Sequence, residues 1–172
     1  EPSRSWRSRA EWERRLGERS AVTVSAFYDA YDSLVDLVVI GDFTGPGNIE
    51  DGRRFGVSAD GTAALDAVGL SNALLRYEGT LQHTSVDDPI TGRSRPFAEE
   101  PEWSYRLEFR QDLPVRRLAW GFDFGQESEV QFHRADERLT AMGGFGNIDA
   151  FIETSRWDAI TLRLGVDNIF DA

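Results

Sequence analysis

Two side chains with the right chemistry for catalysis, His83 and Ser85, stand two positions apart in the sequence. In a β-strand, residues i and i+2 point to the same side, so this spacing allows the Ser–His contact that activates a hydroxyl nucleophile. No third polar residue of the same segment would orient the histidine, because Asp87 and Asp88 already fall in a predicted loop. An ordinary polar strand end explains the pair better, and we expect no catalytic residue and no enzyme activity.

The sequence also contains no complete motif for binding a metal ion or a phosphate group. The adjacent carboxylates Asp87-Asp88 and Glu99-Glu100 could supply oxygen ligands for Ca²⁺, but no spaced loop motif accompanies them, and a solvated acidic loop explains them better. The glycines of 143–146 lack the flanking strand, helix and Lys-Ser/Thr of a phosphate-binding loop, so we interpret them as a bend in a strand. The chain has no Cys and only two His. We therefore expect no metal and no cofactor.

The composition of the chain argues against several other classes of protein. The 172 residues suit one domain, and 30 acidic against 19 basic residues give a net charge of -11, which argues against a nucleic-acid partner. With 11 Phe, 5 Trp and 4 Tyr the chain is too aromatic for intrinsic disorder. No apolar run reaches the roughly 18 residues of a membrane-spanning helix, so we expect no such helix. A membrane β-barrel remains possible, because its strands alternate lipid-facing apolar with lumen-facing polar residues and therefore have a polar mean hydropathy.

A hydrophobic period of two dominates the chain and predicts an all-β fold. In 102–110 and in 159–167, apolar and polar residues alternate strictly, as in half-buried strands. The same rule predicts an antiparallel up-and-down meander of about eight long strands. The first of them would also suit a helix, but its apolar and small residues share one strand face. The expected strands are 4–16, 20–41, 53–65, 72–86, 102–113, 118–133, 139–155 and 158–170.

Connection length and strand length favour a membrane barrel. Short turns near 17–19, 66–71, 114–115 and 155–157 alternate with longer loops, which is typical of outer-membrane barrels. Several segments alternate for about ten residues, the length of a tilted membrane strand, whereas soluble strands usually have about five or six. Trp and Tyr gather near segment ends, where they would suit interfacial girdles or, equally well, the core of a soluble sandwich.

Four stretches, the last of them in two segments, resemble TonB-dependent outer-membrane receptors. Leu162–Asp171 resembles their penultimate strand, with its Asn-Ile-Phe-Asp ending, and Ser25–Asp36 is similar to an aromatic Phe-Tyr strand. Gly47–Asp60 resembles an Asn…Gly signature with Asp60 where Glu is usual, and 86–95 and 109–114 resemble a DP-x-TG…R loop and an f-R-Q-D-l-P strand end. The matching positions are Phe27, Tyr28, Asn48, Gly56, Asp88, Pro89, Gly92, Arg110, Gln111, Asp112, Asn168, Phe170 and Asp171.

The resemblance implies a place in a larger barrel. Family barrels have about 22 strands, and the order of the four stretches matches about strands 14 to 21, in the C-terminal part of the barrel. The family's N-terminal plug, its TonB-binding box and its last aromatic strand are not recognisable here, so we expect a single segment of the barrel domain, 1–172. The implied function is uptake of a ferric siderophore or similar bulky solute across the outer membrane of a Gram-negative bacterium, with outer-membrane lipid and the TonB complex as partners.

Charged residues on the polar side of the expected strands form the candidate site. They are interpreted as lumen-facing, where they form cross-strand charge pairs or line a solute path. Two other functions stay open: a small self-closing outer-membrane barrel with a structural or adhesion role, and a soluble barrel that binds an apolar ligand. Solubility only in detergent would separate the membrane barrels from the soluble one. The candidate lumen-facing residues are Arg106, Glu108, Arg110, Asp123, Glu153, Arg163 and Asp167.

Overall fold

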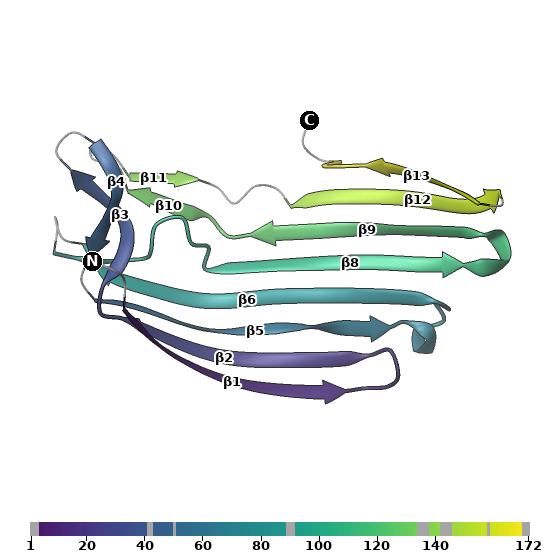
Figure 1. Cartoon of the computed structure of the whole chain (residues 1–172), viewed down its shortest axis with the longest axis horizontal. Coiled ribbons are helices and arrows are strands. Elements are labelled where there is room, and N and C mark those ends of the chain that lie inside the picture. The colour runs from purple at the N-terminus through teal and green to yellow at the C-terminus, as the bar shows by residue number, and fades with distance from the viewer. Residues whose placement is uncertain are drawn as a thin grey trace.

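Eight long strands form one antiparallel sheet in the computed structural model, which describes residues 4–40, 43–49, 51–88, 92–133, 138–141, 146–157 and 159–169 (Figure 1). Their order in the sheet follows their order in the chain, as in a meander. This confirms the predicted all-β class, and the first segment is a strand and not a helix. The strands are β1 (Ser5–Arg15), β2 (Ala21–Tyr31), β5 (Gly52–Ala64), β6 (Ala73–Asp87), β8 (Trp103–Leu113), β9 (Leu118–Glu127), β12 (Asn147–Trp157) and β13 (Ile160–Val166).

The sheet has two chemically different faces, because side chains alternate along each strand. On β5, Val57 lies opposite Leu81 of β6, while the next residue, Ser58, lies opposite Thr80. This register continues across the sheet and gives an apolar face and a polar face. Large hydrophobic side chains of the apolar face remain exposed, among them Trp6, Val24, Phe55, Trp103, Trp120, Ile152 and Leu164.

The two ends of the sheet also differ. One end, the turn end, carries the short connections: the link from Leu16 to Ser20 and two single-turn 3₁₀ helices, η1 (Asp66–Val68) and η2 (Pro114–Arg116). The opposite end, the hairpin end, carries two further hairpins (Figure 1). They consist of β3 (Leu34–Ile40) with β4 (Phe43–Ile49), and β10 (Val130–His133) with β11 (Arg138–Ala141).

These hairpins correct three of the expected strands. The segments 20–41, 118–133 and 139–155 are not continuous strands, because the sheet pairing stops and a separate hairpin begins. After Tyr31 the chain bends, and β3 pairs with β4 in place of the neighbouring long strands. Alternation continues through such a bend, so a sequence pattern cannot locate it. The bend expected at 143–146 lies outside the described residues except for Gly146.

The small buried core lies at the hairpin end. Leu34, Ile49, Val86 and Phe97 are each at most 9% exposed and pack together, with Tyr31 against them. The two-residue strand β7 (Ser94–Arg95) pairs with the end of β6 and leads into this core. Elsewhere a single layer of sheet leaves both faces accessible. Within the described residues, no helix has the length and apolarity needed to cross a membrane.

Candidate functional site

The polar face carries all seven of the charged residues singled out above. β8, β9, β12 and β13 place them side by side, because their positions alternate with apolar residues in a common register. Asp167 follows directly after β13 and lines the same hollow as Arg163. The sequence pattern therefore grouped these side chains on one face, although it did not predict their partners.

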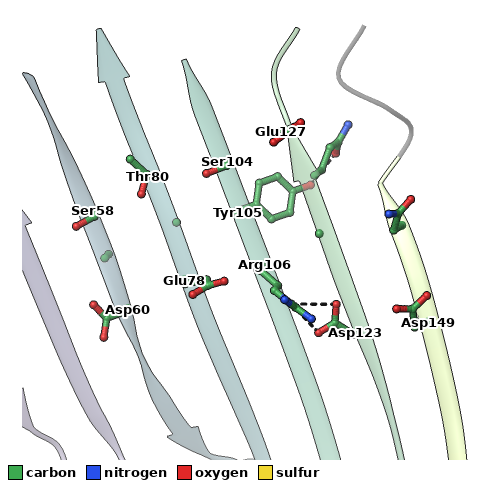
Figure 2. Close-up of a pocket in the computed structure, with 15 residues that line it drawn as sticks. Ser58, Asp60, Glu78, Thr80, Ser104, Tyr105, Arg106, Asp123, Glu127 and Asp149 are labelled. Carbon is green, nitrogen blue, oxygen red and sulfur yellow. Dashed lines mark hydrogen bonds and ion pairs between the residues drawn. The ribbon is translucent and has the colours of Figure 1, made fainter. Parts of the chain in front are cut away.

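A series of ion pairs through Arg106 and Glu108 links three neighbouring strands across the middle of this face. Arg106 Nε donates hydrogen bonds to both carboxylate oxygens of Asp123, over 3.1 and 2.9 Å (Figure 2). The same nitrogen lies 3.7 Å from Glu108, and Glu108 lies 3.7 Å from Arg76 of β6. The Arg106 side chain is 52% exposed, so each ion pair contributes only about 0.2–1 kcal/mol. These pairs orient the charges more than they stabilise the sheet.

A second group of charges lies nearer the turn end. Arg110 donates to Asp112 over 3.0 Å and to Glu153 over 3.3 Å. In the β12–β13 register Glu153 lies directly opposite Arg163, whose guanidinium is 4.0 Å from the centre of the Phe151 ring. The arginines of this region are thus held by carboxylates and by an aromatic face.

A hollow of about 870 Å³ lies on the polar face across β5, β6, β8, β9 and β12. Short side chains, including Ser58, Thr80 and Ser104, leave this space open, and the carboxylates of Glu78 and Asp149 border it (Figure 2). A second hollow of about 510 Å³ adjoins it toward the turn end. Hydroxyl, carboxylate and guanidinium groups of this kind can hydrogen-bond a polar solute.

A buried ion-pair network at the hairpin end was not found by sequence reasoning. Arg95 Nη1 lies 2.8 Å from Asp36 of β3, and its Nε lies 3.1 Å from Asp88. The arginine also donates to the carbonyl oxygens of Leu37 and Pro96. The side chains of Arg95 and Asp36 are only 2% and 7% exposed. The available signal was a charged residue, Asp36, within the apolar run of β3, since buried charges require partners.

The pair His83 and Ser85 shares one face, as the spacing predicts, but each side chain has another partner. The His83 ring lies 5.5 Å from the ring of Phe55, and Ser85 Oγ lies 2.7 Å from Ser94 Oγ. No hydrogen bond between the two is among the contacts of the described residues. The loop carboxylates are also engaged, since Glu100 lies 3.6 Å from Arg54. In the part of the chain that the structure describes, no group of three or more His, Asp or Glu could hold a metal ion.

Several positions of the receptor-like stretches make close contacts. A Cβ on Gly56 would lie 2.8 Å from Phe27, so the absence of a side chain lets the Phe27 ring lie against the strand. Gln111 accepts a hydrogen bond from the indole of Trp120 over 3.0 Å. The backbone N–H of Asn168, a residue with φ of 54°, donates to Asp149 over 2.8 Å. Tyr28 is 46% exposed on the apolar face.

Other positions of the same stretches lie at the hairpin end or beyond the described residues. Asn48 lies opposite Val35 in the β3–β4 hairpin, and Gly92 has φ of 63°, a conformation that favours glycine. Pro89, Phe170 and Asp171 lie outside the described residues.

The comparison with protein families decides the class of this sheet. The family model described as TonB dependent receptor-like, beta-barrel, matches residues 5–169, nearly the whole chain. The chain belongs to this family. Searches among curated proteins and among solved structures returned no significant match.

Membership in the TonB-dependent receptor family gives the two-faced sheet a general role. TonB-dependent receptors are outer-membrane proteins that transport solutes with the help of TonB, and they are not a class of enzymes. The receptor sheet therefore serves transport in the outer membrane. The resemblance drawn from the four sequence stretches is confirmed, and so is the antiparallel β-barrel fold class.

Proposed function

We propose that the chain forms about strands 14 to 21 in the barrel wall of a receptor that imports a ferric siderophore or similar bulky solute into a Gram-negative bacterium. The observation that carries this proposal is the pair of open edges of the sheet. Within the described residues, β1 pairs only with β2, and β13 pairs only with β12. Open edges of this kind call for further strands on both sides.

The cost of open edges explains why a larger barrel is favoured over the alternatives. In a bilayer, backbone groups of an edge strand have no water to bond, so a spanning sheet must close. Closure of these eight strands alone would require pairing of β1 with β13, which the described sheet does not have. It would also crowd Arg106, Glu108 and Arg163 into a narrow lumen, where buried charges cost free energy unless they are paired.

The two faces fit the two environments of such a barrel. We assign the polar face to the lumen, where the seven candidate charged residues and the two hollows border the solute path. We assign the apolar face to outer-membrane lipid, because its large hydrophobic side chains are exposed over the whole sheet. The energy for transport comes from the TonB complex, which acts on the plug of the complete receptor.

Uptake measurements test this proposal directly. The receptor gene is deleted from its host, and uptake of radioactive iron is measured as hydroxamate, catecholate and citrate chelates. We expect uptake of at least one chelate to fall, and to return with the intact gene only in cells with functional TonB. Unchanged uptake of all three chelates, or restoration without TonB, would contradict the proposal.

Purification provides the second test, because it separates a membrane barrel from a soluble one. We expect the full-length protein to leave the outer-membrane fraction only in detergent, since exposed Trp and Leu side chains cover its apolar face. A stable monomer without detergent would support the soluble ligand-binding barrel.

A further inference from the structure

The segment between β7 and β8 folds back against the sheet. β8 pairs with β6 up to the contact between Trp103 and Leu81, and one further backbone bond joins Gln82 to Glu102 over 2.7 Å. Beyond that point β6 pairs with β7, at Val86. Residues 96–101 lie between these two pairings and leave the plane of the sheet.

These six residues fold over the polar face. The backbone N–H of Phe97 donates to Thr84 Oγ1 over 3.0 Å, and the Gln82 side chain donates to the carbonyl oxygen of Pro101 over 2.9 Å. Thr84 and Gln82 lie on the same side of β6 as Thr80, which borders the large hollow. The contacts therefore place the segment on the side of the sheet that we assign to the lumen.

The segment also reaches the second hairpin. The backbone N–H of Glu99 donates to the carbonyl oxygen of Gln131 in β10 over 3.1 Å. In Figure 1 the teal trace that leads into β8 arches toward β10. Residues 96–101, the inner shelf, thus extend from β6 to β10 at the hairpin end.

Phe97 anchors the inner shelf in the buried core. Its side chain is 5% exposed and meets the Tyr31 ring edge-on at 5.8 Å between centroids. A Cβ on Gly52 would lie 3.2 Å from both Phe97 and Leu34, so glycine makes room for this packing. Removal of a buried Phe side chain leaves a cavity, so this packing ties the segment to the core.

Two charged contacts fix the ends of the inner shelf. Before it, Arg95 is held by Asp36, and the same carboxylate accepts the backbone N–H of Ala98 over 3.2 Å. Near its end, Glu100 lies 3.6 Å from Arg54, and these two side chains remain 35% and 28% exposed. One side of the shelf is therefore held in the core, while the other side carries the partly exposed contact between Glu100 and Arg54.

In outer-membrane barrels the longer connections face the outside of the cell, so we assign the hairpin end to that side. We propose that the inner shelf is a prefolded constriction at the solute entrance, and that Arg54 and Glu100 contact the solute as it passes. This inference rests on the proposed transport function and assigns these residues to solute selection. Arg54 Nε and Nη2 also donate to Asp29 over 2.9 and 2.6 Å, which fixes the guanidinium, so a polar chelate replaces only the longer contact to Glu100. A shelf that is ordered before the solute arrives loses little conformational entropy on binding.

Cross-linking in the full-length receptor on whole cells tests the position of the inner shelf. In the double variant Glu99→Cys/Gln131→Cys, the hydrogen bond between the two residues survives, because it joins backbone atoms. We expect a short thiol cross-linker to join the cysteines without added solute. Phe97→Ala is expected to lower the yield several-fold, whereas Val35→Ala, at a 53% exposed position of β3, leaves it unchanged. Absence of the cross-link in a folded receptor with Phe97 intact would overturn the shelf.

Uptake of the same three iron chelates tests solute selection. Phe97→Ala and Glu100→Gln are each expected to change the relative uptake of the chelates several-fold, while Val35→Ala does not. Unchanged relative uptake after the cross-link is lost would overturn the selective role. If no chelate enters with the unaltered receptor, the proposed function and solute contact both fail, whereas the cross-link still decides whether the shelf exists.

Discussion

Arg95 and Asp36 are 59 residues apart in the sequence and form an ion pair of 2.8 Å that is almost fully buried. The pair joins the β3–β4 hairpin to the connection between β6 and β8. It lies next to the core formed by Leu34, Val86 and Phe97. The hairpin end is therefore a folded unit, in which segments distant in sequence depend on each other.

Loss of the buried arginine is expected to destabilise the hairpin end without unfolding the sheet. In Arg95→Leu, the buried carboxylate of Asp36 loses its cationic partner, and breaking a buried ion pair costs about 3–5 kcal/mol. We expect faster cleavage at the hairpin end by protease added to whole cells, with normal amounts of assembled barrel. The control Arg93→Leu removes an equal charge from an exposed position of the same connection and is expected to have a smaller effect. Equal cleavage of both variants would contradict the role of the buried pair.

Adjacent positions on β8 are expected to respond oppositely to a change of polarity. Leu107 lies on the apolar face between the aromatic residues of that strand, and an Arg near the bilayer centre costs about 2–4 kcal/mol. Arg106→Leu removes only partly exposed ion pairs of the polar face. Leu107→Arg should therefore reduce heat-modifiable, folded receptor on gels far more than Arg106→Leu. Similar loss in both variants would mean that the strand does not span the membrane.

Thiol labelling is expected to separate the two faces of β5. Ser58 borders the large hollow, whereas Val57 is 48% exposed on the apolar face. In isolated outer membranes, we expect a water-soluble maleimide to label Ser58→Cys and to leave Val57→Cys largely unlabelled, because lipid covers it. Val57→Cys should react after denaturation, which shows that the thiol is intact. Preferential labelling of Val57→Cys in the membrane would reverse the assignment of the faces.

Gly56 and Gly79, on adjacent strands, are expected to differ in their tolerance of alanine. A Cβ on Gly56 would meet the carbonyl oxygen of Leu81 and approach Phe27 to 2.8 Å, whereas one on Gly79 has no neighbour closer than 3.6 Å. Forced overpacking typically costs about 1–3 kcal/mol. Gly56→Ala should lower the temperature at which the folded band is lost, and Gly79→Ala should not. Equal melting temperatures of the two variants would show that β5 shifts to accommodate the added Cβ at no cost in stability, which would contradict the prediction.

The sequence by itself determined the local features of the receptor: strands, their direction and their two faces. Side chains alternate with a period of two, so the expected strand 102–113 matches β8 at Trp103–Leu113 almost residue for residue. The same alternation placed Arg106, Glu108 and Asp123 on one face. These properties depend on neighbours within one strand and on the order of the strands, and both can be seen in a single sequence.

Only the tertiary structure decided where strands stop pairing and what the hairpin end contains. The expected strand 20–41 divides after Tyr31, because β3 pairs with β4 and its Leu34 packs against Phe97 in the buried core. Alternation is the same in either arrangement, so the pattern contains no information about the partner. The contact between Arg95 and Asp36 likewise depends on how a hairpin folds back over a distant connection. Such contacts result from packing and charge pairing in three dimensions, which the spacing of residues along one chain does not encode.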